Sequence, residues 1–250
     1  MSSRLRGRKV WVVGADPTGG AELARELVRR GADVAISGRR PAELAEVSGG
    51  SMTTVPADVT DPGAVDEAVA AVREGLGGLD TVVFSAGYWK QFDAAEWDRE
   101  TFARHVEVNL LGLNNVLAAV VPGLVDQGRG HLVGIASVAG YRGIAGSEAY
   151  GATKAAQLNL LEAMRASLSP KGIRVTTVAP GFVRTEMTSA NAFPMPFIID
   201  ADEAGRTIAD GLERGDDNIV FPRRMAVAMG VARLLPGRLW TAITTRGAKA

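Results

Sequence analysis

The sequence predicts an α/β fold in which a doubly wound parallel sheet lies between two layers of helices. Short apolar runs, typical of buried parallel strands, alternate along the chain with longer stretches that have the periodicity of amphipathic helices. The first apolar run, 10–13, ends in a glycine-rich turn that leads directly into a helical pattern, as in nucleotide-binding βαβ units. Residues 1–250 therefore fit one three-layer, Rossmann-type domain, since no stretch has the composition of a linker.

Each expected strand is a short apolar run bounded by glycine, proline or polar residues, and the expected helices repeat apolar residues three or four apart. Gly31 ends the first helix, because glycine readily adopts the left-handed conformation found at helix C-termini. Asp61 begins the second helix, since an aspartate followed by proline is a typical helix start. In chain order, the expected strands are 10–13, 34–37, 52–56, 81–84, 132–136, 174–178 and 218–221. The expected helices are 21–30, 62–74, 99–126, 148–169 and 201–213.

The composition excludes several kinds of protein. Lysine plus arginine number 28, as do aspartate plus glutamate, so bulk charge does not favour a nucleic-acid partner. With no cysteine and only two histidines, neither disulfides nor a metal site are expected. The start of the chain does not have the pattern of a secretory signal, and there is no run of 18 apolar residues. We therefore expect a cytoplasmic enzyme.

The glycine-rich turn spans Gly14 to Gly20 and includes Asp16, Thr18 and Gly19. Its position between a strand and a helix brings backbone N–H groups and a helix N-terminus to one point, which suits a pyrophosphate. The turn therefore predicts a dinucleotide site.

Two side chains in the 148–169 helix form a candidate proton-transfer pair. Tyr150 and Lys154 are four residues apart and share one helix face, so the ammonium group is expected to lower the phenol pKa. Ser137 lies thirteen residues upstream of Tyr150, at the end of a strand. Asn109 lies inside an expected helix, although asparagine has a low helix propensity, which indicates that its side chain has a specific role.

This set of residues, in this order and spacing, resembles the short-chain dehydrogenase/reductase family, in its single-domain branch with a Tyr-x-x-x-Lys active site. The residues that carry the resemblance are Gly14 to Gly20, Asp58, Ser85, Ala86, Gly87, Asn109, Ser137, Tyr150, Lys154, Pro180 and Gly181. The resemblance implies that Tyr150 exchanges a proton with the substrate oxygen, which Ser137 orients. It also implies that Lys154 contacts the nicotinamide ribose and that Asn109 holds a water connecting Lys154 to solvent.

The chain departs from the family pattern at two places. Thr18 replaces the middle glycine of the turn, so either Gly19 takes the unusual dihedral angles or the cofactor binds less tightly. Phe84 and Ser85 replace two asparagines that precede Ala86 and Gly87 in the family.

The end of the second strand indicates which cofactor binds. Enzymes of this fold that use NAD place an acidic residue there, whereas this chain has Ser37, Gly38, Arg39 and Arg40. Arginine suits a 2′-phosphate, so we expect NADP(H), with Ser37, Arg39 and Arg40 as contacts. The remaining cofactor contacts implied by the resemblance are Asp58 and Val59 at the adenine, Ser85, Ala86 and Gly87 along the strand ends, Tyr150, Lys154, and Pro180, Gly181, Val183 and Thr185 around the nicotinamide.

Two apolar segments lie outside the regular alternation. Residues 186–200 are expected to form a lid over the substrate, with packing or a subunit contact as the alternative. Residues 222–250 interleave arginines with apolar side chains and are expected to form two short helices broken at Pro236. These helices could pack on a second subunit, lie on a membrane surface, or close the site together with the lid, which is our prediction.

The sequence thus predicts an NADP(H)-dependent oxidoreductase acting on CH–OH groups, which interconverts a small, apolar ketone or aldehyde with its alcohol. One alternative is a reductase of a lipid-linked carbonyl at a membrane surface. An alternative from another class is a non-catalytic homologue that senses NADP or acts as a scaffold. By resemblance, we expect a homodimer or homotetramer in which the long helices carrying Asn109 and Tyr150 supply one interface.

Overall fold

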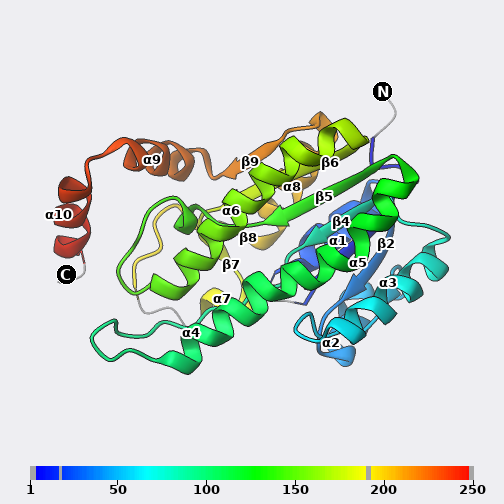
Figure 1. The fold of residues 1–250 in the computed structure, drawn as a ribbon, viewed down its shortest axis with the longest axis horizontal. Helices are drawn as coiled ribbons and strands as arrows, with labels where there is room; N and C mark the ends of the chain where they lie inside the picture. The colour runs from blue at the N-terminus through cyan, green and yellow to red at the C-terminus, as the bar shows by residue number, and fades with distance from the viewer. Residues whose placement is uncertain (1–3, 17–18, 190–192, 248–250) are drawn as a thin grey trace.

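The computed structural model describes residues 4–16, 19–189 and 193–247, and its centre is a seven-stranded parallel sheet (Figure 1). The strand order is β3-β2-β1-β4-β5-β6-β9, which confirms the doubly wound fold predicted from the sequence. The strands are β1 (Lys9–Val13), β2 (Asp33–Ser37), β3 (Thr53–Thr54), β4 (Thr81–Phe84), β5 (Gly130–Ile135), β6 (Ile173–Pro180) and β9 (Asn218–Phe221).

Helices cover both faces of the sheet, because successive residues of each strand point to opposite sides. In β1, Val12 packs beneath α1 (Ala21–Arg29), α2 (Pro41–Ser48) and α8 (Ala201–Arg214). Its neighbours Trp11 and Val13 pack beneath α3 (Pro62–Leu76), α5 (Gly112–Gln127) and α6 (Glu148–Leu168) on the other face. The runs of apolar residues in the strands are therefore explained by burial on both sides.

The predicted helix 99–126 is continuous but not uniform. It consists of α4 (Arg99–His105), a π-helical segment (Val106–Leu111) and α5. The span Arg99–Gln127 has the length and apolar content of a membrane helix, contrary to the expectation of no such run. However, Val116, Val120 and Leu124 are buried against the sheet, as in the core helix of a globular protein.

Other elements differ from the expectation mainly at their ends. The predicted strand 52–56 is shortened to β3, and α2 was not expected at all, although Pro41 at its first turn is a typical helix start. Asp61 caps α3 by accepting hydrogen bonds from two backbone N–H groups, as predicted. The segment after β6 contains β7 (Val183–Arg184), α7 (Glu186–Ser189) and β8 (Ile199–Asp200).

The C-terminal segment forms the two expected helices, α9 (Arg223–Leu234) and α10 (Gly237–Gly247), which extend to one side of the sheet (Figure 1). The inner face of α9 packs against residues that follow β5 and end β6 through Met225, Met229 and Ala232. Trp240 Nε1 donates a hydrogen bond to the carbonyl oxygen of Gly143 at 2.7 Å. The opposite face of α9 is exposed, and Leu234 retains 85% of its accessible surface.

Candidate active site

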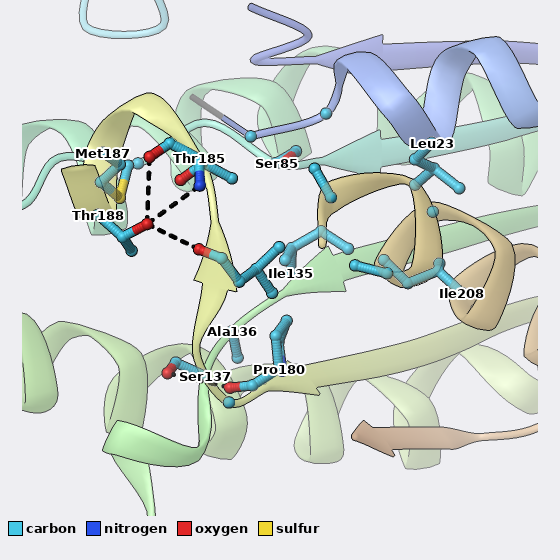
Figure 2. A pocket seen from close by; sticks show the side chains of 18 of the residues that line it. Leu23, Ser85, Ile135, Ala136, Ser137, Pro180, Thr185, Met187, Thr188 and Ile208 are labelled. Atoms are coloured by element: carbon cyan, nitrogen blue, oxygen red, sulfur yellow. Dashed lines mark hydrogen bonds between the residues drawn. The ribbon is translucent and has the colours of Figure 1, made fainter. Parts of the chain in front are cut away.

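Two adjoining cavities lie at the carboxyl edge of the parallel sheet, where ligands bind in folds of this kind. We call them the Tyr150 cavity, of about 140 Å³, and the Arg39 cavity, of about 380 Å³. They share Gly87 and Met187 in their walls. Figure 2 shows the Tyr150 cavity, with Leu23 and Ile208 from the helices on one side and Ser137 and Pro180 from the strand ends on the other.

Most of the predicted site residues line these cavities. The Tyr150 cavity is lined by Gly19, Gly20, Ser85, Gly87, Ser137, Tyr150, Lys154, Pro180, Gly181, Val183 and Thr185. The Arg39 cavity is lined by Gly14, Asp16, Arg39, Arg40, Asp58, Val59, Ala86 and Gly87. The structure therefore brings together predicted residues that are up to 171 positions apart in the sequence, from Gly14 to Thr185.

The glycine turn passes unusually close to the end of β4. Gly14 has φ +81°, and a Cβ atom on it would lie 2.3 Å from the backbone nitrogen of Ala86. Gly19 is not among the glycines with positive φ, so of the two alternatives the one in which it takes the unusual dihedral angles is contradicted. Its restriction is steric instead, because a Cβ atom there would meet the Ser85 hydroxyl at 3.0 Å. Thr18 lies outside the described residues.

The last residue of β2 and the two arginines that follow it have three different roles. Ser37 is completely buried, and its hydroxyl accepts a hydrogen bond from Trp11 Nε1 at 2.8 Å. Its side chain therefore lines neither cavity, which corrects the prediction that Ser37 contacts the cofactor. Arg40 forms ion pairs with Asp16, Glu43 and Glu186. Arg39 is exposed, and within the described part of the chain no ion pair engages its guanidinium group.

Asp58 is held in place at the wall of the Arg39 cavity. Its Oδ1 accepts hydrogen bonds from the backbone N–H and the hydroxyl of Thr60, at 2.9 and 2.8 Å. Burial alone would raise the pKa of Asp58. The hydrogen bonds from Thr60 and the positive charges of Arg39 and Arg104 outweigh burial, so the net effect is a lowered pKa. Asp58 is therefore a fixed carboxylate beside a positively charged side chain.

Tyr150 and Ser137 meet at the Tyr150 cavity, from α6 and from the loop after β5. Although part of the Tyr150 side chain reaches the cavity, burial of its hydroxyl raises the pKa to about 12, and a hydrogen bond with Ser137 opposes this shift. Ser137 Oγ also accepts a hydrogen bond from the N–H of Ala139 at 3.1 Å. The predicted pair of hydroxyl groups is thus in contact.

Lys154 lies deeper, with 3% of its surface exposed. Its Nζ donates hydrogen bonds to the carbonyl oxygen of Ile135 at 2.8 Å and to Gln157 Oε1 at 3.0 Å, and lies 5.5 Å from the Tyr150 ring centre. Burial lowers the Lys154 pKa to about 7. The prediction that Lys154 lowers the Tyr150 pKa is therefore not met in this structure, because burial dominates both groups.

Asn109 lies in the π-helical segment and is completely buried. Its side chain joins two elements, since Oδ1 accepts from the Tyr88 N–H at 2.7 Å and Nδ2 donates to Thr153 Oγ1 at 3.0 Å. Its main-chain oxygen accepts a hydrogen bond from Gln157 Nε2 at 2.6 Å. Asn109 therefore connects to Lys154 only through another side chain, Gln157, that the sequence did not single out.

Two aromatic side chains beside Tyr150, Trp89 and His105, were also missed by the sequence analysis. The ring of Trp89 lies edge-on to Tyr150, with centres 5.3 Å apart, and His105 lies 6.4 Å from the same ring. Phe193, from the predicted lid, packs on Trp89 at 6.4 Å. We call Trp89, His105 and Phe193 the aromatic wall. A tryptophan two residues beyond the predicted glycine at position 87 is the one sequence signal that could have indicated it.

The described parts of 186–200 border the site as a lid would. Met187 and Thr188 line the Tyr150 cavity, and Figure 2 shows the Thr188 hydroxyl hydrogen-bonded to residues just before this segment, Thr185 and Val183. The C-terminal extension touches this segment, since Arg224 lies over the Phe197 ring at 5.9 Å. No described residue beyond Phe221 lines either cavity, so the described part of the extension borders the site through contacts such as this one with the predicted lid.

Comparison with known proteins agrees with this geometry. A model of the short chain dehydrogenase family matches residues 8–193. An uncharacterized oxidoreductase of Myxococcus xanthus (strain DK1622) is 38% identical over 245 residues, which make up 96% of this chain and 97% of that protein. An uncharacterized oxidoreductase of Staphylococcus aureus (strain MW2) is 33% identical over 72% of this chain and 79% of its own length.

The fold is shared with solved structures as well. A short chain dehydrogenase from Burkholderia cenocepacia J2315, determined in complex with NADP, superposes with a TM-score of 0.81 and 28% identity. The superposition covers 97% of this chain and 98% of that one, so the likeness extends over the C-terminal helices.

Proposed function

The chain belongs to the short-chain dehydrogenase family, and we propose that it is an NADP(H)-dependent oxidoreductase that interconverts a ketone or aldehyde with its alcohol. The observation that carries the proposal is the meeting of Tyr150, Ser137 and Lys154 in one cavity that the glycine turn also borders. A proton donor and a nucleotide-binding turn at one point are what hydride transfer to a carbonyl requires. The substrate class is proposed as apolar because Leu23, Met187 and Ile208 line the Tyr150 cavity and the ring of Trp89 lies beside Tyr150.

Three features of the described residues fit a nicotinamide dinucleotide phosphate. The glycine turn and the start of α1 border the Tyr150 cavity, where backbone N–H groups and the positive end of the helix suit a pyrophosphate. Arg39 offers an exposed guanidinium group at the Arg39 cavity, which suits a 2′-phosphate. Gly38 and Arg39 stand where an NAD-binding chain would have a carboxylate. The NADP complex of the Burkholderia relative supports the same choice.

The residues of the chain handle the proton and the orientation of the substrate. The bound nicotinamide supplies the hydride to the carbonyl carbon or accepts it from the alcohol. Tyr150, which its raised pKa keeps protonated at neutral pH, donates its proton to the carbonyl oxygen. Ser137, in hydrogen-bond contact with the Tyr150 hydroxyl, holds the same oxygen in position. A protonated phenol at neutral pH favours the direction of carbonyl reduction.

The decisive experiment measures NADPH oxidation with a panel of ketones and aldehydes. The wild-type protein should turn over at least one class, and Tyr150→Phe should bind NADPH normally but lose turnover, since only the hydroxyl is removed. Failure of the wild-type protein across the whole panel would favour the non-catalytic alternative, in which NADP is sensed and not used. A Tyr150→Phe variant with wild-type rates would refute the assigned proton donor.

A second candidate function is reduction of a lipid-linked carbonyl at a membrane surface. The observation that favours it is the exposed outer face of α9, formed by Val227, Val231 and Leu234. Residues 218–250 contain six basic residues and no acidic one, in a chain of zero net charge. A basic, apolar face of this kind suits an anionic membrane surface. Co-sedimentation with anionic vesicles that depends on residues 222–250 would support this candidate.

A further inference from the structure

A buried glutamine connects two members of the active site. Gln157 lies on α6, three residues after Lys154, and is 1% exposed. Its Oε1 accepts a hydrogen bond from Lys154 Nζ at 3.0 Å, and its Nε2 donates to the main-chain oxygen of Asn109 at 2.6 Å. Both bonds are completely enclosed by protein. Gln157 is therefore a direct bridge from the active-site ammonium group to the π-helical segment.

The chemistry of the two partners fixes the orientation of this amide. An ammonium group can only donate hydrogen bonds, and a carbonyl oxygen can only accept them. The amide oxygen must therefore face Lys154 and the amide nitrogen must face Asn109, and turning the amide over would break both bonds. The two contacts thus define one orientation of Gln157.

We propose that Gln157 is a positioning residue for Lys154, and that its amide occupies the link for which the family resemblance implies a water held by Asn109. This proposal rests on the proposed function, with the charged Lys154 beside Tyr150 stabilising the phenolate that forms as Tyr150 gives up its proton. A water accepts and donates hydrogen bonds through one oxygen and can pass a proton along, whereas the Gln157 amide accepts at Oε1 and donates at Nε2. The amide therefore does not relay protons from Lys154 toward Asn109. Protons then reach the site from the side of the Tyr150 cavity, where Tyr150 and Ser137 lie.

The groups around Lys154 make the Gln157 contact important for its charge. The acceptors are the carbonyl oxygen of Ile135 at the end of β5 and the amide oxygen of Gln157 on its own helix. Tyr150 faces it from α6, and the nearest histidine, His105 of α4, contacts the Tyr150 ring. Among the described residues, no carboxylate forms an ion pair with Lys154. Two neutral oxygens therefore stabilise the charged form against burial.

Three substitutions at position 157 distinguish support of the Lys154 charge by hydrogen bonding from simple packing. Gln157→Leu fills the same space but removes both hydrogen bonds, so the charged form of Lys154 loses support. Gln157→Glu places a carboxylate beside Lys154 and strengthens that support. Gln157→Ala leaves space bordered by the Asn109 oxygen and Lys154 Nζ, two polar groups that can hold a water. Gln127→Leu is the matched control, because Gln127 of α5 also donates to main-chain oxygens, those of Leu79 and Arg129, but makes no hydrogen bond with Lys154.

The readouts are the pH profile of carbonyl reduction and a titration of Lys154 that needs no turnover. The chain has five lysines, so Lys154 can be followed by NMR of lysine labelled with ¹³C at Cε and assigned by its loss in Lys154→Ala. Because the proposed reduction needs the charged form of Lys154, kcat/KM should fall as pH rises through the pKa of Lys154. This fall is the basic limb of the pH profile. Gln157→Leu should move this limb and the NMR titration down by about one pH unit, and Gln157→Glu should move both up.

Gln157→Ala should keep a profile close to the wild type, whereas Gln157→Leu should lose most of its activity at neutral pH. Gln127→Leu should change neither the limb nor the titration. Unchanged titrations in all three Gln157 variants would overturn the proposal and leave Gln157 a packing residue. If the wild-type protein fails to reduce any carbonyl, the proposed function fails instead, and the NMR titration still tests the link between Gln157 and Lys154.

Discussion

Replacing Gly14 with alanine should destabilise the protein in a way that depends on the neighbouring strand. Gly14 has φ +81°, and a Cβ atom there would lie 2.3 Å from the nitrogen and 2.4 Å from the Cα of Ala86. Gly49 offers a matched control at the end of α2. It also has positive φ, +50°, but a Cβ atom there would have nothing within 4 Å. The two substitutions thus share the dihedral strain and differ in the collision.

The expected magnitudes follow from these distances. An alanine at positive φ costs about 1–2 kcal/mol, which the lower entropy of the unfolded chain offsets by about 0.4–1 kcal/mol. Gly49→Ala should therefore reduce the free energy of unfolding by no more than about 1.5 kcal/mol. At Gly14 the obstacle is backbone, which cannot rotate away as a side chain can, so a further loss of about 1–3 kcal/mol is expected.

Urea unfolding of both variants beside the wild type measures these differences, with the midpoint compared at equal slope. A titration of NADPH completes the assay, because Gly14 and Ala86 both line the Arg39 cavity and moving them apart should weaken binding. Gly49 lines neither cavity, so Gly49→Ala should bind NADPH like the wild type. Equal unfolding midpoints for the two variants would refute the close approach of the glycine turn to β4.

Two further predictions concern cofactor choice and the C-terminal helices. Arg39→Ala should reduce the preference for NADPH over NADH about tenfold or more in kcat/KM, because a charge-assisted hydrogen bond is lost. An unchanged ratio would show that the 2′-phosphate is recognised elsewhere. Truncation after Phe221 should lower the unfolding free energy by roughly 3–6 kcal/mol, since Met225 and Met229 are buried, and should raise KM. If the truncated protein lost vesicle binding but kept normal stability and kinetics, the membrane role would be favoured instead.

The fold was predictable because its signals are local and repeated. Each buried strand is an apolar run, and helix starts such as Asp61 before Pro62 carry their own capping chemistry. The edges of the sheet were less predictable, because β3 has only two paired residues and its sequence barely differs from a loop. The π-helical segment around Asn109 was not predictable, since its sequence is compatible with an ordinary α-helix.

Within the site, sequence reasoning found most of the residues that line the cavities, but it could not distinguish them from residues that only support the site. Arg39 and Arg40 are adjacent and chemically identical, so only the contacts of Arg40 with Asp16 and Glu186 distinguish their roles. Ser37 resembled a polar contact, yet its hydroxyl bonds inward to Trp11. Gln157 carries no motif at all, and its importance depends on one hydrogen bond within α6, to Lys154, and one to Asn109 in the π-helical segment. Subunit association and cellular location stay predictions.

The pair of Tyr150 and Lys154 shows why pairwise reasoning from a sequence can mistake the direction of a pKa shift. A spacing of four residues correctly placed the two groups on one face, but it contained no information on how far each is removed from water. Burial raises the pKa of Tyr150 to about 12 and lowers that of Lys154 to about 7, so both shifts favour the neutral forms. Near neutral pH, Tyr150 then remains a proton donor while Lys154 is the group that titrates. The pH dependence of activity in this range should therefore report the lysine, and the residues that hold its ammonium group, Ile135 and Gln157, should control it.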